Sequence, residues 1–323
     1  MNRTRNRLRR LLLCVVLLFS LCGCTVKSTL PHDDGKIKVA ATLFPQYSFA
    51  KAIAGDRAEV ELILPPGTDS HAFDPSMSEL LKVKDADLFL YTGDKMETWA
   101  SSFIRNADES MTVVDLSEGI PILSLHDDED DGEHEHEHDH AHHHGHELNI
   151  DPHIFTSPVN AIHMAQAICA ALCKLDPDGE ETYTENAEAL YASLSSLDER
   201  FRTLAREADG KTLYFGGKFS LLYFVHEYGF SYMSLYDSCA EGSEPSVRRM
   251  SEIIEAMKRD RAKVIFYPEL SDPKAAESIA ECTDAEALLF HSCHNLSARD
   301  FKDGKTYVDF MTQNYENLKE ALS

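Results

Sequence analysis

Cysteine is scarce in this chain, since only eight of its 323 residues are cysteines and three of these fall within the first 24 positions. The other five are spread along the remaining sequence, at Cys169, Cys173, Cys239, Cys282 and Cys293. Five thiols are too few to build a disulfide scaffold, so a hydrophobic core must hold the fold together. Cys169 and Cys173 are one helical turn apart and poorly placed to bridge each other. Cys239 and Cys293 could be joined, or could be free, small buried residues.

Positively charged residues are also few, because the chain has 31 Lys and Arg residues and 55 Asp and Glu residues. Five of the basic residues are arginines at the start of the chain: Arg3, Arg5, Arg7, Arg9 and Arg10. Without them, 26 basic residues remain against 55 acidic ones, a net charge of −29. A surface this negative repels nucleic acid and anionic lipid headgroups, and it raises the local concentration of cations. We therefore expect no nucleic-acid partner.

The apolar run near the start of the chain is short. Residues 11–21 are interrupted only by Ser20 and cannot span a bilayer, so behind the five arginines they predict a signal peptide over residues 1–23. The run ends in Leu21-Cys22-Gly23-Cys24, which resembles the lipobox of bacterial lipoproteins. Because Gly23 favours cleavage before Cys24, we expect lipid on Cys24. Residues 24–35 would then tether an extracytoplasmic protein to the cell membrane.

Histidine, in contrast, is concentrated in one internal tract. Residues 126–146 read HDDEDDGEHEHEHDHAHHHGH and hold nine of the sixteen histidines: His126, His134, His136, His138, His140, His142, His143, His144 and His146. The tract has almost nothing apolar to bury and cannot offset the entropy of folding. A solvated acidic loop or an expression tag are the simpler explanations. The internal position and the alternation of His with acids favour metal handling.

Outside the tract, strands alternate with helices, which is typical of parallel sheets with ligand loops at their carboxyl edge. The predicted strands are 36–42, 60–64, 88–91, 113–114, 212–215, 263–267 and 287–290. The predicted helices are 76–84, 158–174, 180–208, 221–228, 247–259, 273–282 and 307–322. Helix 180–208, about 40 Å long, suits a spine between two lobes. We expect an α/β protein with lobes at 36–179 and 209–323 that consist of parallel sheets flanked by helices and are joined by this long rigid helix.

Three histidines outside the tract lie where a strand ends or a helix begins. His71 lies in PPGTDSHAFDPS after strand 60–64, His153 in DPHIFTSP before a helix, and His294 in HSCHNLS after strand 287–290. Any one of them alone would be an ordinary surface or core histidine. All three, however, point to the carboxyl edges of the predicted sheets, where ligands bind in open α/β folds. This convergence predicts a metal site.

Several segments, in order, resemble the zinc- and manganese-binding lipoproteins of bacterial ABC importers. PGTDSHAFDPSMSEL and DPHIFTSPVNA resemble the first two ligand motifs, and ADLFLYTGDKMETWA resembles the strand and turn between them. AKVIFYPELSDPKAAESIAECT and GKTYVDFMTQNYENLKEAL resemble the closing part of the fold. The resemblance covers about residues 36–322. It implies a non-enzymatic zinc receptor, expected to be a monomer, that delivers Zn²⁺ to a permease and ATPase complex.

The resemblance also implies ligands, residue by residue. His71 and His153 match the first two histidines of the family, and His294 falls where many members have a carboxylate, with His291 as the near alternative. The third family histidine corresponds to Lys218, whose protonated amine is a poor zinc ligand.

The identity of the fourth ligand is therefore undecided at this point. Glu269, just past strand 263–267, could supply an oxygen, Glu241 is a weaker candidate, and a water is also possible. His226 lies too far along its helix to substitute easily. Nitrogen-rich ligation favours zinc over manganese or magnesium. Binding should weaken below about pH 6, where free imidazoles become protonated.

Two other functions compete with the receptor. A zinc hydrolase would use three histidines, a bound water and Glu269 as general base, but no HExxH or nucleophile motif supports it. A lipid-anchored zinc store would use the tract as its main site.

Overall fold

The computed structural model describes residues 35–124, 150–208, 210–236 and 246–323. The chain divides after Lys36, and the fold described below is that of Ile37–Ser323. The predicted signal peptide, Cys24, the histidine tract, Cys239 and Glu241 all lie outside the described residues. Within them, no helix is both long and apolar enough to cross a membrane.

The first sheet has four parallel strands in the order β2-β1-β3-β4. Their bounds are β1 (Ile37–Ala41), β2 (Ala58–Leu62), β3 (Leu88–Tyr91) and β4 (Thr112–Asp115). The whole of β3 is buried and apolar, as expected of a strand covered on both faces. Since all four strands run the same way, the loops that follow them gather at one carboxyl edge.

The second sheet repeats this arrangement, in the order β6-β5-β7-β8. Its strands are β5 (Thr212–Phe215), β6 (Ser231–Ser234), β7 (Val264–Tyr267) and β8 (Glu286–Leu289). In each sheet, the strand that comes first in the sequence lies between the strands that come second and third. The predicted α/β fold with two parallel sheets is confirmed.

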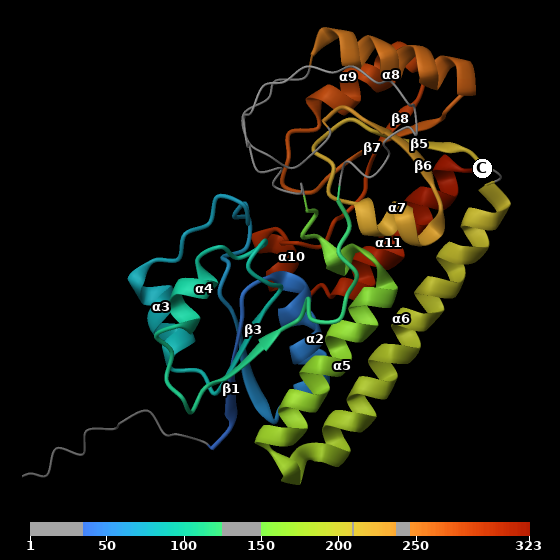
Figure 1. Cartoon of the computed structure of the whole chain (residues 1–323). Coiled ribbons are helices and arrows are strands. Elements are labelled where there is room, and N and C mark those ends of the chain that lie inside the picture. Colours follow the sequence, from blue (N-terminus) through green and yellow to red (C-terminus); the bar gives the residue numbers. More distant parts are fainter. Residues whose placement is uncertain (1–34, 125–149, 209, 237–245) are drawn as a thin grey trace, which may run out of the picture. The chain divides into compact units, whose positions relative to one another are not determined.

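Helices cover the sheets and connect the strands (Figure 1). The first half holds α2 (Phe44–Ala54), α3 (Met77–Lys84), α4 (Ala100–Ile104), η1 (Ile154–Thr156), α5 (Pro158–Leu175) and η2 (Pro177–Gly179). The second half holds α7 (Leu222–Tyr228), α8 (Val247–Asp260), α9 (Lys274–Thr283), α10 (Ala298–Lys302) and α11 (Tyr307–Ala321). Helix α3 begins with a capping box, in which Ser76 and Glu79 satisfy each other's backbone N–H groups.

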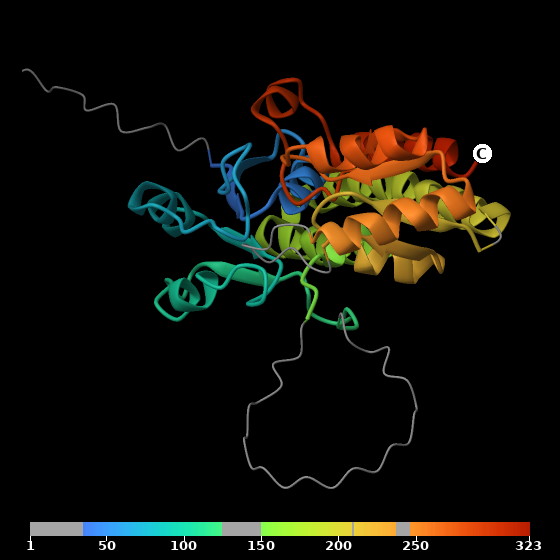
Figure 2. The same cartoon turned by 90° about the horizontal axis from the view of Figure 1, so that it is seen from above.

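Helix α6 (Glu180–Ala208) has 29 residues, which corresponds to about 43 Å. Its buried residues recur every three or four positions, from Tyr183 through Leu194 to Leu204, and form one apolar stripe. The helix packs on α5 and α2 of the first half and on α11 and α7 of the second. It runs as one straight element alongside both sheets (Figures 1 and 2). A single hydrophobic core therefore extends from one lobe into the other.

The structure differs from the sequence prediction in a few elements. Strand β2 ends at Leu62, two residues before the predicted end, although Ile63 and Leu64 are both buried. The prediction missed β6, α4 and α10, which are all short. In β6 the first three residues are partly exposed, so it lacks the continuous apolar run that marks the inner strands.

Candidate metal centre

Three of the predicted site residues, His71, His153 and His294, lie together. His71 is in the loop between β2 and α3, His153 directly precedes η1, and His294 follows β8. The Nε2 atoms of His71 and His153 are 3.1 Å apart. The ring of His294 lies almost equally far from both, with centroid distances of 6.3 Å to His71 and 6.4 Å to His153.

These distances can be compared with those around a tetrahedral zinc ion. Zn–N bonds of about 2.0–2.1 Å place two ligating nitrogens about 3.3 Å apart and their ring centroids about 5 Å apart. His71 and His153 already meet both values, since their centroids are 5.1 Å apart. His294 would have to move inward by about 1 Å. Among the described residues no three such side chains already surround one point as a closed metal cluster.

Hydrogen bonds join the loop of His71 to the loop of His294. The N–H of Gly67 donates to the carbonyl of Leu296 at 2.8 Å. The side-chain amide of Asn295 donates to the carbonyls of Pro65, at 3.0 Å, and Thr68, at 2.7 Å. Gly67 has a φ of 84°, a conformation that favours glycine. The two lobes thus present their histidines to each other from loops that are already connected.

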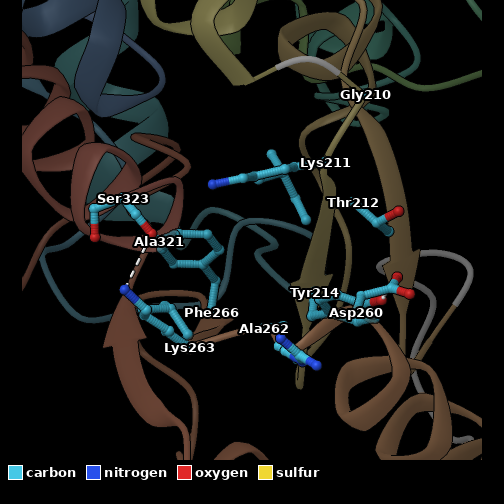
Figure 3. A pocket seen from close by; sticks show the side chains of 13 residues that line it. Gly210, Lys211, Thr212, Tyr214, Asp260, Ala262, Lys263, Phe266, Ala321 and Ser323 are labelled. Carbon is cyan, nitrogen blue, oxygen red and sulfur yellow. Dashed lines mark hydrogen bonds between the residues drawn. The ribbon is translucent and has the colours of Figure 1, made fainter.

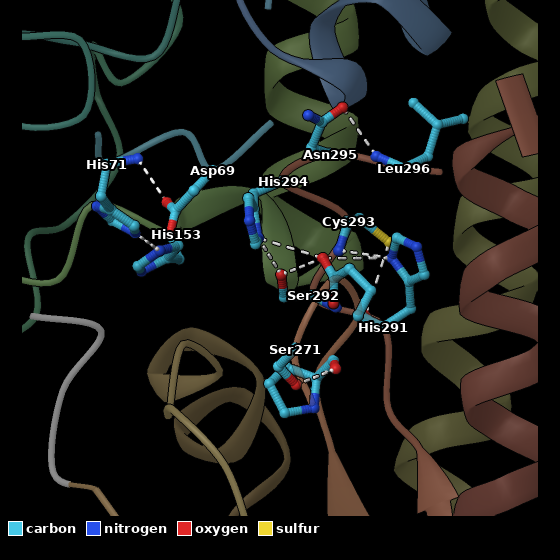
Figure 4. A network of polar contacts seen from close by, with 12 residues as sticks. Asp69, His71, His153, Ser271, His291, Ser292, Cys293, His294, Asn295 and Leu296 are labelled. Carbon is cyan, nitrogen blue, oxygen red and sulfur yellow. Dashed lines mark hydrogen bonds and ion pairs between the residues drawn. The ribbon is translucent and has the colours of Figure 1, made fainter. Parts of the chain in front are cut away.

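A polar residue two positions before each histidine helps to hold it. Asp69 Oδ1 accepts the backbone N–H of His71 at 2.9 Å, and Asp151 Oδ1 accepts that of His153 at 2.8 Å. Ser292 Oγ lies 2.6 Å from Nδ1 of His294 (Figure 4). The sequence analysis missed all three of these residues. Their repeated spacing, in DSH, DPH and SCH, was the signal that could have identified them.

Asp151 also determines which nitrogen His153 presents to the cluster. Its Oδ1 atom lies 2.6 Å from Nδ1 of His153, and both side chains are almost completely buried. The pKa of the Asp151 carboxyl is lowered although burial acts to raise it, because His153 lies beside it and donates to it. An ionised Asp151 accepts Nδ1–H, which leaves Nε2 of His153 as an acceptor. In this hydrogen-bond network His71 then donates Nε2–H to His153.

Glu269 lies behind His294, on the Nδ1 side of its ring. Glu269 Oε1 is 3.1 Å from Nδ1 of His294 and accepts the hydroxyl of Ser292 at 2.7 Å, while Oε2 accepts the N–H of Ser292 at 2.8 Å. Its pKa is lowered although burial acts to raise it, because His291 and His294 face it and Ser292 donates to it. If His294 bound a metal through Nε2, this carboxylate would be on the opposite side of the ring. The geometry favours orientation of His294 over ligation by Glu269.

The structure does not bring His291 to the three histidines. Its ring is stacked on Phe310 with centroids 3.8 Å apart, and its Nδ1 accepts the N–H of Cys293 at 3.0 Å. It lies on the far side of Cys293 from His71 and His153 (Figure 4). These contacts give His291 a role in packing and not in the histidine cluster.

Two cavities differ in their relation to the cluster. A cavity of about 270 Å³ is lined by His71 and His294 together with Asp69, Lys218 and Ser220. Another, of about 290 Å³, lies at the amino-terminal edge of the second sheet (Figure 3). There Lys263 Nζ donates to the carbonyl of Ser323 at 3.1 Å. Only the first of the two adjoins the candidate metal centre.

The surroundings of His71 favour its neutral form. Its pKa is lowered to about 4, first because the imidazole is partly withdrawn from water, although the residue as a whole is exposed, and then because His153 and His294 lie nearby. We expect a nuclear magnetic resonance titration of the metal-free protein to show a His71 midpoint near pH 4, and a midpoint near 6.5 after unfolding. Between these values the unfolded chain binds the additional proton, so stability should fall as the pH falls from 6.5 to 4. A folded-state midpoint near 6.5 would contradict this account.

Replacement of Asp151 by asparagine should weaken metal binding by about 10- to 100-fold, because the charge that orients His153 is lost while the shape is kept. Asp69→Asn is the matched control, since Asp69 also accepts a backbone N–H, that of His71. Calorimetric titration of both variants tests the difference. Equal losses in the two variants would show that the contact with the His153 ring does not matter.

The fold and the clustered histidines are those of a two-lobed metal-binding protein. The family model described as zinc-uptake complex component A, periplasmic (ZnuA) matches residues 39–321. The chain belongs to this family, which confirms the resemblance inferred from sequence.

Two relatives and one crystal structure are close to the chain. It is 32% identical over 308 residues to the high-affinity zinc uptake system protein ZnuA of Bacillus subtilis, covering 95% of this chain and 94% of the relative. It is 30% identical to the zinc-binding lipoprotein AdcA of Streptococcus pneumoniae, but spans only 60% of that longer protein. The Zn(II)-bound ZnuA-like domain of AdcA aligns with a TM-score of 0.72 at 27% identity, covering 89% of this chain and 99% of the domain.

Proposed function

We propose that this chain is an extracytoplasmic receptor that binds Zn²⁺ through His71, His153 and His294 and delivers it to an ABC permease and ATPase complex. Membership in a family of zinc-uptake components supports a receptor and not an enzyme. The zinc-uptake function of the B. subtilis relative and the Zn(II)-bound structure of the AdcA domain support zinc as the cargo. The functional division that we propose has lobes at 36–179 and 209–323, joined by the helix 180–208.

One observation carries the proposed site: the Nε2 atoms of His71 and His153 are 3.1 Å apart, and the His294 ring lies equally far from both. Three imidazoles are a nitrogen-rich ligand set, which suits zinc better than manganese or magnesium. Both His153 and His294 have a carboxylate beside Nδ1, an arrangement that fixes the tautomer of metal-binding histidines.

The two competing functions receive less support. For a hydrolase, Glu269 would have to act on a metal-bound water, but its oxygens are engaged by Ser292 and His294. For a store, the main site would be the tract 126–146, whereas the described residues already bring three histidines together. Glu269 and His291 are less suited as fourth ligands, because Glu269 lies where it orients His294 and His291 packs against Phe310.

We further propose that lipid on Cys24 anchors the protein to the cell membrane and that it acts as a monomer. The lipobox-like sequence before Cys24 supports the anchor. A strongly acidic lipid-anchored protein would attract cations close to the membrane that carries the permease.

Deletion of the gene in its host tests the proposed function. We expect the initial rate of radioactive zinc uptake to fall at low external zinc, and growth to be restored by added zinc but not by added manganese. Complementation with the wild-type gene should restore uptake, whereas complementation with His153→Ala should not. An unchanged initial uptake rate in the deletion strain would contradict the receptor and favour a store.

Zinc binding should change the shape of the protein little. Helix α6 contacts elements of both lobes, the core is continuous, and the loops of His71 and His294 are already hydrogen-bonded to each other. Closure of the site should therefore need a local shift of about 1 Å and no large domain rotation. Small-angle scattering profiles of metal-free and zinc-loaded protein should nearly superimpose, and a marked compaction on binding would contradict this prediction.

A further inference from the structure

The three histidines leave one position open on a tetrahedral zinc ion. Glu269 lines the cavity beside the cluster, but its oxygens are engaged by Ser292 and His294, and His153 is buried with Nδ1 held by Asp151. The cavity of about 270 Å³ reaches the cluster where His71 and His294 form part of its wall. A water molecule occupies about 30 Å³, so this cavity has room for a small molecule. The fourth ligand would therefore come from the cavity side.

Lys218 gives the cavity a fixed positive charge. Its ammonium group has no lone pair at neutral pH, so it cannot bind zinc and would repel it. Its nearest described carboxylate is that of Asp69, at 3.8 Å, and the two side chains are 39% and 44% exposed. An ion pair this long and this exposed stabilises little. Asp69 and Glu269 line the same cavity, but Glu269 is engaged by Ser292 and His294, so a further anion between the zinc ion and Lys218 would offset the repulsion between the two cations.

The backbone that carries Lys218 is closely packed. A Cβ atom at Gly217 would lie 2.5 Å from Cδ of Pro268, and one at Gly216 would lie 2.7 Å from Ala276. The glycine pair thus lets the loop after β5 press against the loop after β7, which carries Glu269. Ser220, which is only 3% exposed, lines the same cavity two residues beyond Lys218. The cation and the hydroxyl are therefore presented from a constrained loop.

We propose that this site takes zinc together with a small carboxylate anion, one oxygen of which completes the coordination while the other pairs with Lys218 and Ser220. The inference rests on the proposed zinc receptor and specifies the form in which the cargo is captured. A carboxylate fits because it can bridge two cations through its two oxygens. The site would then favour zinc carried by small organic acids over the bare ion.

Acetate is a suitable probe because it is a single carboxylate with no other metal-binding group. In zinc titrations of the whole mature chain in perchlorate buffer, added acetate should tighten the strongest equivalent by about tenfold, the value of one charge-assisted interaction. The visible spectrum of the Co²⁺-loaded protein should also change when acetate is added. Lys218→Met, which keeps the length but removes the charge, should lose both responses. Lys305→Met, at a lysine that lines a different cavity, should respond like the wild type.

A second variant keeps the test informative. Lys218→His offers a fourth imidazole, so it should bind zinc tightly without acetate and show no response to it. An equal acetate response in the wild type and Lys218→Met would overturn the inference. Tight zinc binding that is unchanged by acetate in both of these proteins would also overturn it. Loss of the tight zinc in Asp69→Asn would also overturn it, because Asp69 would then be the fourth ligand. Failure of the receptor itself is distinguishable, since only then would His153→Ala leave the tight zinc unchanged.

Discussion

Alanine in place of His71, His153 or His294 should weaken the tightest zinc equivalent by about two orders of magnitude or more. Structural zinc sites contribute about 10–16 kcal/mol over four ligands, so each ligand accounts for about 3 kcal/mol. The loss should be largest for His153, because its removal also leaves the buried Asp151 carboxylate without the imidazole that it accepts from. Competition titration with a chromophoric chelator measures the change.

Two further histidines serve as controls. His226 is exposed on α7, and His226→Ala should bind zinc like the wild type. His291→Ala should lower the unfolding temperature, because it removes the stack on Phe310, but it should keep the tight zinc. If His291→Ala abolished zinc binding while His294→Ala did not, the assignment of the third ligand would be wrong.

The sequence could predict the fold because its strands and helices differ in apolar pattern. The fully apolar β3 and the stripe of α6 were both evident, since burial on two faces and burial on one helical face leave different periodicities. Strand β2 was displaced because Glu59 and Glu61 lie within it, whereas the apolar Ile63 and Leu64 follow it. An apolar run in the sequence indicates which residues are buried, and here Ile63 and Leu64 are buried although the strand has already ended at Leu62.

The site was only partly predictable, for a different reason. His71, His153 and His294 could be selected because loops after parallel strands share one edge. The sequence left His291 as an alternative to His294, because three residues of loop decide whether a ring meets Phe310 or the other two histidines. Asp151 and Glu269 orient the rings of His153 and His294 through the Nδ1 atoms. Which ring nitrogen faces a carboxylate depends on the three-dimensional arrangement and has no sequence pattern. The cavity beside Lys218 is formed by segments far apart in sequence and had no local signal.

Deletion of residues 126–146 should reduce the number of bound zinc ions while leaving one tight zinc. The tract lies outside the described residues, which resume at Ile150 after ending at Ser124. Ser124 and Ile150 pair across an antiparallel bridge, and the N–H of Asp151 donates to the carbonyl of Leu123 at 3.0 Å. Ser124 and Ile150, the described residues on either side of the deletion, therefore lie side by side, and a short Gly-Ser linker between them should not move His153.

The expected result follows from the composition of the tract. Its alternating histidines and acids offer several overlapping sites, and each zinc bound there must order the chain at an entropic cost. Calorimetry of the full-length protein should show additional, weaker equivalents that the deletion removes. A second variant, with all nine tract histidines replaced by asparagine, keeps the length and should lose the same equivalents. Zinc uptake by cells that carry either variant should slow mainly when zinc is scarce, because the tract would then no longer concentrate zinc near the site. Loss of the tight equivalent in both variants would instead show that the tract is the receptor site itself.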